Sequence, residues 1–518
     1  MTPTSRTDVL DRAFPAPSDA FNGLVQLRDR RTRTRRIAAG AVTMVAVAIV
    51  VAAILGGWRL PFSRMPASGP INPSNVGELG LDWWGSTTTN IDSQPIVADD
   101  RVYVLSGDGT LSVFPTDCGS SRCDPIWSAT AGRGSSRPWG SAVVAGDRVY
   151  QPSSDGRLVG YPTSCAADPC RPDWIGAAAG DLTTASPVAA DGFVFVGSDE
   201  CCHGSRSFGH LFAFSASCET FPTPCRPVWK ATLAHGFFGG QPVIVDGRVY
   251  VGSSDGTVYA FPTTCAAVRG RCEAVWNART HGRIAAKVGF GIVTQIVTPL
   301  VASGSSLYVA SGSSLYAFPL SCDASPCVPT WIAHTGGWIN DIAAGDRFVY
   351  ASAEPHLQYG GRGFPGGTFV FPTGCSHRCS AAWDFGTTQS SPTIAGGVVY
   401  LVGSGNAGDS AFDEACVGAG AGCAPLWTMS ADNGATVNFG SVTDDALYVG
   451  GQDGNLHVFR RGGSATCCDA GAPSEGRWVA YLIYALVIGG LGLLVLRRRA
   501  ASRSRADRPE PCRRSGLN

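Results

Sequence analysis

Two long apolar stretches stand near the ends of the chain, at residues 37–57 and 478–496, and neither contains a charged residue. At ~1.5 Å rise per residue the first reaches about 30 Å, enough to cross the hydrocarbon core of a bilayer, and the second is only slightly short. Arginines crowd residues 28–36 and 497–505, the outer flanks of the two stretches. By the positive-inside rule we predict two transmembrane helices, both termini in the cytoplasm, and residues 58–477 outside. The alternatives are a cleaved signal peptide and a buried core helix.

Between these stretches the pattern changes to short segments that are rich in β-branched and aromatic residues. RVYVL at 101–105, RVYVG at 248–252 and VVYLV at 398–402 are examples. Turn residues separate the segments, and Asp-Gly pairs at positions such as 108–109 and 255–256 are strong hairpin signals. Each unit offers four short antiparallel strands, which is the architecture of a β-propeller blade.

Seven of these units also carry a pair of cysteines, and a tryptophan follows the second cysteine by four residues each time. The pairs are Cys118/Cys123, Cys165/Cys170, Cys218/Cys225, Cys265/Cys272, Cys322/Cys327, Cys375/Cys379 and Cys416/Cys423. The tryptophans are Trp127, Trp174, Trp229, Trp276, Trp331, Trp383 and Trp427. They recur about every 50 residues, a spacing typical of propeller blades.

The hairpin pattern occurs in eight units, but the last one, at 441–459, lacks its Trp strand. Near the start of the region, 81–84 supplies a Trp strand that nothing precedes. We therefore predict an all-β fold, an eight-bladed propeller with four-stranded antiparallel blades, closed by the N-terminal strand and flanked by the two transmembrane helices. The expected organisation is a cytoplasmic tail (1–36), a transmembrane helix (37–57), a linker (58–80), the propeller (81–460), a linker (461–477), a second transmembrane helix (478–496) and a cytoplasmic tail (497–518).

The units resemble pyrroloquinoline-quinone-type (PQQ-like) propeller repeats, in a membrane-anchored bacterial form. The matching residues in one unit are 249–252 (VYVG), 255–256 (DG), 258–261 (VYAF) and Trp276. The resemblance covers about 84–459 and implies eight blades. It departs at the turn before the Trp, where a cysteine-bounded loop replaces the usual residues. Because this group includes dehydrogenases, kinase sensor domains and assembly or scaffold proteins, the resemblance leaves the function open.

The chain contains 19 cysteines, and the seven pairs account for 14 of them. An extracytoplasmic location permits disulfides, so we expect seven local bridges, each pinning the hairpin between the third and fourth strands of its own unit; zinc is the alternative, although the spacing suits it poorly. Two adjacent pairs, Cys201-Cys202 and Cys467-Cys468, stay open, as a loop staple or paired with each other. Quinoprotein dehydrogenases use an adjacent-Cys disulfide beside the cofactor, so the resemblance also makes Cys201 and Cys202 candidate cofactor neighbours. Cys512 is expected to be a free thiol.

Several polar and aromatic residues fall in the loops that should converge on one face of the propeller. The candidates for a quinone site are Arg283, Trp338, Asn340, Asp341 and Glu354, together with Cys201 and Cys202; the alternative is that they are solvated loop residues. We find no phosphate loop and no HExxH or GxSxG motif, so no catalytic residue and no metal ligand is assigned.

Composition excludes one class of function and indicates the kind of source organism. The formal net charge is zero, which argues against nucleic-acid binding, and all but two of the 40 basic residues are arginine, which indicates a bacterial genome rich in G and C. We predict a two-pass cell-membrane protein whose propeller is a binding or scaffold module for proteins or envelope components, without enzymatic chemistry or a cofactor. The alternative is a PQQ-dependent oxidoreductase of the alcohol or sugar dehydrogenase kind, which would require PQQ and calcium.

Overall fold

The computed structural model describes most of residues 69–463. The gaps inside this range are 132–139, 154, 179–181, 183–185, 201–207, 234–240, 254, 267–269, 281–299, 323, 355, 358–362, 365, 387–390, 404–408, 418–421 and 430–436. Both apolar stretches, both tails, Cys467, Cys468 and Cys512 lie outside the described residues. Within them, no helix has the length and apolarity needed to span a bilayer.

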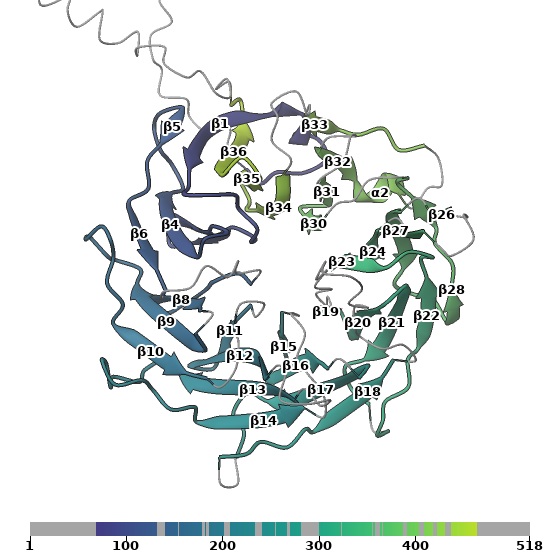
Figure 1. Ribbon diagram of the computed structural model, residues 1–518. Coiled ribbons are helices and arrows are strands. Elements are labelled where there is room, and N and C mark those ends of the chain that lie inside the picture. Colours follow the sequence, from purple (N-terminus) through teal and green to yellow (C-terminus); the bar gives the residue numbers. More distant parts are fainter. Residues whose placement is uncertain are drawn as a thin grey trace, which may run out of the picture. The chain divides into compact units, whose positions relative to one another are not determined.

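Eight four-stranded antiparallel sheets stand as blades around a ring (Figure 1). Blade 1 contains β2 (Ile96–Ala98), β3 (Arg101–Leu105), β4 (Thr110–Pro115) and β6 (Trp127–Thr130). Blade 2 contains β7 (Val143–Ala145), β8 (Arg148–Pro152), β9 (Arg157–Pro162) and β10 (Trp174–Ala177). Blade 3 contains β11 (Val188–Ala190), β12 (Phe193–Glu200), β13 (Phe208–Ser215) and β14 (Trp229–Leu233). Blade 4 contains β15 (Val243–Val245), β16 (Arg248–Gly252), β17 (Thr257–Pro262) and β18 (Trp276–Arg279).

The second half of the ring continues in the same order. Blade 5 contains β19 (Leu300–Ser303), β20 (Ser306–Ser311), β21 (Ser314–Pro319) and β22 (Trp331–His334). Blade 6 contains β23 (Ile339–Ala344), β24 (Phe348–Ala353), β27 (Gly367–Pro372) and β29 (Trp383–Asp384), with the extra hairpin β25 (His356–Leu357) and β26 (Gly363–Phe364). Blade 7 contains β30 (Ser391–Ala395), β31 (Val398–Val402), β32 (Asp409–Asp413) and β33 (Trp427–Met429). Blade 8 contains β34 (Val437–Val442), β35 (Ala446–Gly451), β36 (Asn455–Arg461) and β1 (Leu79–Ser86).

Short elements occupy the remaining loops. The edge strands β5 (Arg122–Cys123) and β28 (His377–Cys379) lie beside blades 8 and 5, and two short helices, η1 (Val76–Glu78) and α2 (Glu414–Val417), complete the elements of the described residues. The helix α2 was not expected from the sequence.

Blade 8 combines strands from the two ends of the described chain. β1 runs antiparallel to β36, with Leu81 opposite Phe459 and Trp84 opposite His457. Figure 1 shows the purple β1 beside the yellow β36. The residues before β1 also pack here, because Ile71 and Val76 are buried against blades 7 and 8. The predicted linker 58–80 therefore includes residues that belong to the propeller.

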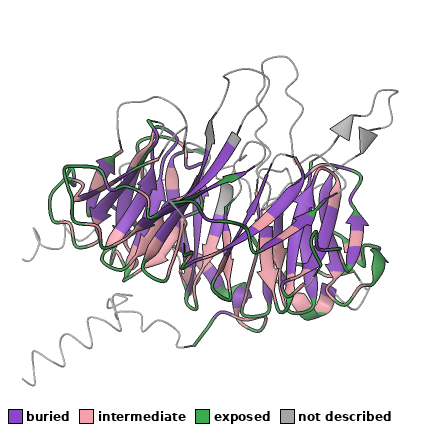
Figure 2. Ribbon diagram, turned by 90° about the horizontal axis from the view of Figure 1, so that it is seen from below, coloured by how far each residue is buried: buried purple, intermediate pink, exposed green. Residues whose placement is uncertain are grey.

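The burial of each strand follows from its position in the blade. The second and third strands are packed on both sides by neighbouring blades, so nearly every residue in β3 or β24 is buried, whereas the outer strands alternate (Figure 2). The Asp-Gly turns form because the Asp side chain accepts the amide two residues on: Asp255 Oδ1 accepts the Thr257 N–H at 2.9 Å. The following glycine, Gly256, has φ of 85°, a conformation that favours glycine.

Aromatic pairs hold neighbouring blades together. In seven of the eight junctions an outer-strand Trp packs against an aromatic residue of the third strand of the next blade, with ring centroids 5.4 to 6.4 Å apart. The pairs are Trp83–Phe114, Trp127–Tyr161, Trp174–Phe214, Trp229–Phe261, Trp276–Phe318, Trp331–Phe371 and Trp427–Phe459. Between blades 6 and 7, Phe385 takes this place and contacts Phe412 at 4.6 Å.

The strand order gives the ring two distinct faces. The loop face carries the Asp-Gly turns and the connections between blades, and the disulfide face carries the cysteine loops and the turns between first and second strands. Both ends of the described chain lie on the disulfide face, where Leu79 pairs with Arg461 and the Arg461 guanidinium donates to the Gly69 carbonyl at 2.5 Å.

Candidate functional site

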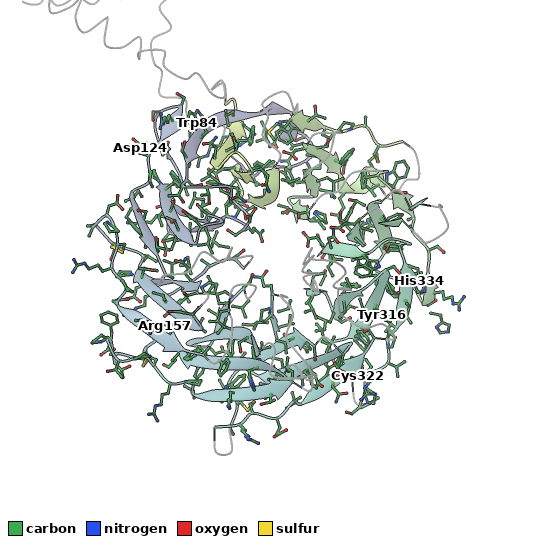
Figure 3. All side chains as sticks on the ribbon, viewed as in Figure 1. Trp84, Asp124, Arg157, Tyr316, Cys322 and His334 are labelled. Carbon is green, nitrogen blue, oxygen red and sulfur yellow. A yellow bond between two sulfur atoms is a disulfide. The ribbon has the colours of Figure 1, made fainter. Side chains whose placement is uncertain are left out.

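Seven disulfides are present in the described residues, each between the two cysteines of one loop, and they are the pairs expected from the sequence. They are Cys118–Cys123, Cys165–Cys170, Cys218–Cys225, Cys265–Cys272, Cys322–Cys327, Cys375–Cys379 and Cys416–Cys423. The second cysteine is buried in six of the seven loops, whereas the first is half-buried in all of them. Figure 3 shows Cys322 near the periphery of the ring. The bridges are therefore placed at the outer edges of the blades, away from the ring's centre.

The loops do more than close a hairpin, because the segment around the second cysteine pairs with the outer strand of the preceding blade. We call this segment the edge segment. It forms the parallel strands β5 on β1 and β28 on β22, and single parallel bridges such as Gly176–Cys225 and Ala278–Cys327. At the Gly176–Cys225 bridge, for example, the backbone N–H of Cys225 donates to the Ile175 carbonyl at 2.7 Å.

Edge segments cover the outer strands of blades 8, 1, 2, 3, 4 and 5. The remaining contacts are the bridge Lys230–Arg271 and the bond from the Cys170 N–H to the Ser128 carbonyl at 2.7 Å. An outer strand otherwise presents unpaired backbone groups, which invite association with other chains. Each of these disulfides thus holds a strip of backbone that closes the edge of its neighbour.

Cys272 has a contact beyond the hairpin that its disulfide closes. Its bridge to Cys265 is as predicted, but its side chain is 5% exposed and packs in the core shared with Trp229 of the preceding blade. Its backbone N–H donates to the Lys230 carbonyl at 3.0 Å. In this loop Arg271 makes the parallel bridge, whereas in the loops of blades 3 and 5 the second cysteine makes it. The predicted disulfide is confirmed, and Cys272 in addition joins two blades.

Blades 6 and 7 are different. In the described residues no edge segment pairs with β29 or β33, and the Cys416–Cys423 loop forms α2 instead. The residues after the repeat Trp, Asp384 and Thr428, are exposed. In the covered blades the equivalent residue is half-buried, as at Ser128 and Ile175, except for the exposed Lys230 of blade 3. This part of the ring therefore departs most from the repeat.

Four of the seven quinone-site candidates meet at the loop face of blade 6. Asn340 and Asp341 belong to β23, Trp338 precedes it, and Glu354 follows β24, where its N–H donates to the Trp338 carbonyl at 2.8 Å. Arg283, Cys201 and Cys202 lie outside the described residues.

The carboxyl group of Asp341 serves the junction with blade 7. Burial raises its pKa to about 6, and hydrogen bonds from the Ser391 side chain and the Ile342 N–H act in the opposite direction. The Ile342 N–H lies 2.8 Å from Asp341 Oδ1. The Asp341 carboxyl group therefore accepts hydrogen bonds both from its own strand and from blade 7.

The innermost strands give no support to a quinone site. β2, β7, β11, β15, β19, β30 and β34 contain no charged residue, and Asp341 is the one carboxylate on β23. A site for PQQ and calcium needs several carboxylate ligands and basic groups around one point. Across the described part of the chain, no three His, Cys, Asp or Glu residues are grouped so that they could hold a metal ion.

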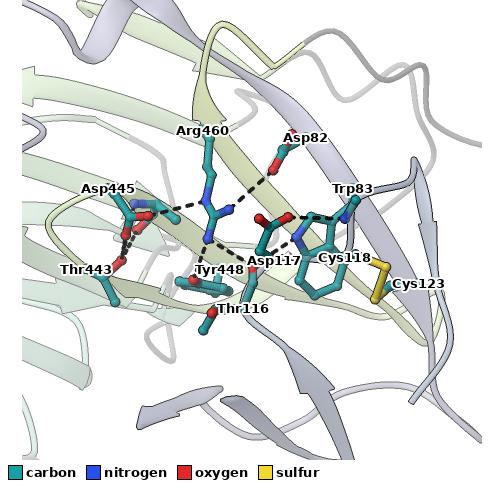
Figure 4. A network of polar contacts seen from close by, with 12 residues as sticks. Asp82, Trp83, Thr116, Asp117, Cys118, Cys123, Thr443, Asp445, Tyr448 and Arg460 are labelled. Carbon is teal, nitrogen blue, oxygen red and sulfur yellow. Dashed lines mark hydrogen bonds and ion pairs between the residues drawn. A yellow bond between two sulfur atoms is a disulfide. The ribbon is translucent and has the colours of Figure 1, made fainter. Parts of the chain in front are cut away.

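One charged group that the sequence did not single out joins blades 8 and 1. The guanidinium of Arg460 donates to the Thr116 carbonyl at 2.9 Å and lies 3.6 Å from Asp82 and 3.5 Å from Asp445 (Figure 4). The Trp83 indole N–H donates to the same Thr116 carbonyl at 3.2 Å. Arg460 thus ties β36 both to the N-terminal strand and to blade 1.

The comparisons with known proteins support a PQQ-like propeller. Residues 80–167 match the family model described as "Outer membrane protein assembly factor BamB". BamB from Moraxella catarrhalis is 15% identical with a TM-score of 0.51, and the alignment covers 74% of this chain and 97% of that one. This likeness establishes the fold alone. No curated protein matches the sequence.

Two further structures have the same fold. A quinohemoprotein alcohol dehydrogenase, ADHIIG from Pseudomonas putida HK5, is 13% identical with a TM-score of 0.51, covering 78% of this chain and 79% of that one. Sqt1 from Chaetomium thermophilum is 13% identical with a TM-score of 0.53, covering 74% and 98%. An assembly factor and a dehydrogenase thus stand among the similar structures, so the fold does not select between them.

Proposed function

We propose that this protein is a two-pass, membrane-anchored scaffold whose propeller lies outside the cytoplasm and binds another protein or an envelope component. The observation that carries the proposal is the set of edge segments held by disulfides, since disulfides persist in oxidising compartments. The resemblance to an outer membrane protein assembly factor supports a role in binding proteins.

The position of the chain ends supports an orientation. Both ends of the described chain leave the disulfide face side by side, and the apolar stretches at 37–57 and 478–496 follow within short distances along the sequence. With both stretches in the membrane, the disulfide face is directed toward the bilayer. The loop face is then directed away from it and is the surface available to a partner.

A matched pair of serines in blade 5 tests this proposal. Ser313 lies in the turn between β20 and β21 on the loop face, and Ser305 lies in the turn between β19 and β20 on the disulfide face. A photo-crosslinking residue at each position, in cells that express the full chain, should give a discrete protein adduct from position 313 and none from position 305. Adducts from neither position, or loss of the protein from the membrane fraction, would contradict the proposal.

The second candidate is a PQQ-dependent oxidoreductase. It is favoured by the meeting of Trp338, Asn340, Asp341 and Glu354 on one blade and by the similarity to a quinohemoprotein alcohol dehydrogenase. Against it stand the engaged Asp341 carboxyl and the apolar inner strands. We rank it second for this reason.

A further inference from the structure

Aligning the blades on the aromatic residue of the third strand reveals one exception in the core. Three residues before that aromatic, seven blades have a fully buried Leu, Val or Thr, and blade 7 has Asp409. The seven residues are Leu111, Leu158, Leu211, Val258, Leu315, Thr368 and Leu456, each with 0% exposure. Asp409 is 2% exposed. A carboxyl group has therefore replaced an apolar side chain without any change in burial.

The Asp409 side chain faces the junction between blades 7 and 8. Ala411, two residues along the same strand, packs with Val402 of blade 7 and Val449 of blade 8, and side chains two apart share a face of a strand. Opposite Asp409 in the next strand lies Met429. The surroundings of the carboxyl group are thus mainly apolar.

The hydrogen bonds of this carboxyl group are incomplete. Asp409 Oδ1 accepts the Gly403 N–H at 3.1 Å, whereas Oδ2 is buried and has no hydrogen-bond partner among the described residues. A buried carboxylate oxygen without a donor is strongly unfavourable, and a protonated carboxyl is far less so. The geometry therefore favours the neutral form.

One ionisable residue of blade 8 faces this junction: His457 of β36 lies on the same face as Val449, and its side chain is 3.3 Å from the carboxylate of Asp453. β31, β33, β34 and β35 contain no Asp, Glu, Lys, Arg or His, and their titratable residues are Tyr400 and Tyr448. Burial raises the pKa of both tyrosines, so they stay neutral across the physiological range. Burial also raises the pKa of Asp409 itself to about 7, and only the Gly403 N–H acts in the opposite direction.

We propose that Asp409 is a proton-binding switch for the junction between blades 7 and 8. With a proton bound, the side chain is buried like the leucines of the other blades, and the junction is tight. When the proton is lost, the carboxylate requires water or a cation, and the loop end of the junction opens to admit it. This places a pH-sensitive element where the ring departs from its repeat, since β33 also lacks an edge segment among the described residues.

The competing explanation is a purely structural cap. Asp409 would then stay ionised, bind the Gly403 amide and fix the loop that begins there, as Asp255 does in its own turn. The two explanations differ in what a neutral isostere does. Asp409→Asn keeps an oxygen acceptor for Gly403 but cannot ionise, and Asp409→Leu restores the residue found in most blades.

Hydrogen exchange of the full chain in detergent, followed by mass spectrometry between pH 5.5 and 8.5, tests the proposal. After correction for the intrinsic pH dependence of exchange, the opening equilibrium of peptides from β32, β33 and β35 should increase about tenfold per pH unit from pH 5.5 to about pH 7 and level off above it, because the closed and open states are then both ionised. Asp409→Asn and Asp409→Leu should each abolish this dependence, and Asp255→Asn should leave it intact.

Two results would overturn the proposal. The first is corrected protection of these peptides that does not change with pH in the unmodified protein. The second is a pH dependence that persists in the Asn variant, which would assign it to another group. If the Leu variant fails to fold, the Asn variant alone decides, since it has the same size and retains the bond to Gly403.

Discussion

The edge segments predict that two disulfides of equal ring size contribute unequally to stability. Cys218–Cys225 and Cys416–Cys423 both have a sequence separation of 7, so the loop-entropy term is about 2 kcal/mol for each. The first also holds an edge segment, in which the Cys225 N–H donates to Ile175 and the Ala177 N–H donates to the Cys225 carbonyl at 3.2 Å. The second holds no such segment in the described residues.

Two backbone hydrogen bonds are worth about 2 kcal/mol together. Replacing both cysteines of a pair by Ala should therefore lower the free energy of unfolding by about 4 kcal/mol for Cys218/Cys225 and about 2 kcal/mol for Cys416/Cys423. Guanidinium denaturation followed by Trp fluorescence measures both values. The Cys265/Cys272 pair has the same separation and an edge segment, so it should behave like the first. Equal losses for all three pairs would refute the role assigned to the edge segments.

Three further predictions concern charged groups. Arg460→Met should destabilise the protein by about 3 kcal/mol in a denaturation experiment, because Asp82, Asp445 and the Thr116 carbonyl lose their common partner. The control is Arg157→Met, which removes a surface contact to Asp155 and should change stability by less than about 0.5 kcal/mol. Because the pKa of Asp341 is raised in the folded state, the contribution of this group to stability is full below about pH 4 and is lost as the pH rises through about 6. Asp341→Asn should therefore raise the free energy of unfolding by up to about 3 kcal/mol at pH 8 and leave it unchanged at pH 3.5. Leu315→Asp, which copies Asp409 into blade 5, should lower the thermal midpoint at pH 8 far more than at pH 5, and an equal shift at both values would contradict the burial argument.

The repeat was predictable because its signals are local. The hairpin turns, the Cys pairs and the Trp four residues later lie within one unit, and the unpaired Trp strand at 81–84 called for a partner at 455–459. The edge segments were not predictable, since backbone groups of two different blades form them and no side-chain pattern marks them. Cys272 is one example: its disulfide was predicted, but its contact with the preceding blade was not. Asp409 was not recognised from the sequence, because its unusual position becomes visible only when the third strands of the blades are aligned on their aromatic residues.

The candidate site was predictable only in part. Trp338 and Glu354 meet because β23 and β24 form an antiparallel hairpin, so that the start of β23 and the end of β24 lie side by side on the loop face, opposite the turn. The hydrogen bond between Ser391 and Asp341 could not be predicted, because it depends on how blade 7 packs against blade 6. Arg283, Cys201 and Cys202 stay predictions, as do the membrane segments.

The central claim, that the propeller is a binding scaffold and not a quinone enzyme, is tested most directly by a cofactor titration. The purified full chain is incubated with PQQ and Ca²⁺, and the absorbance of the bound quinone and dye-linked oxidation of alcohols and sugars are measured. For a binding scaffold we expect no saturable binding of the quinone and no oxidation of either substrate class. A stoichiometric, redox-active quinone would contradict the central claim.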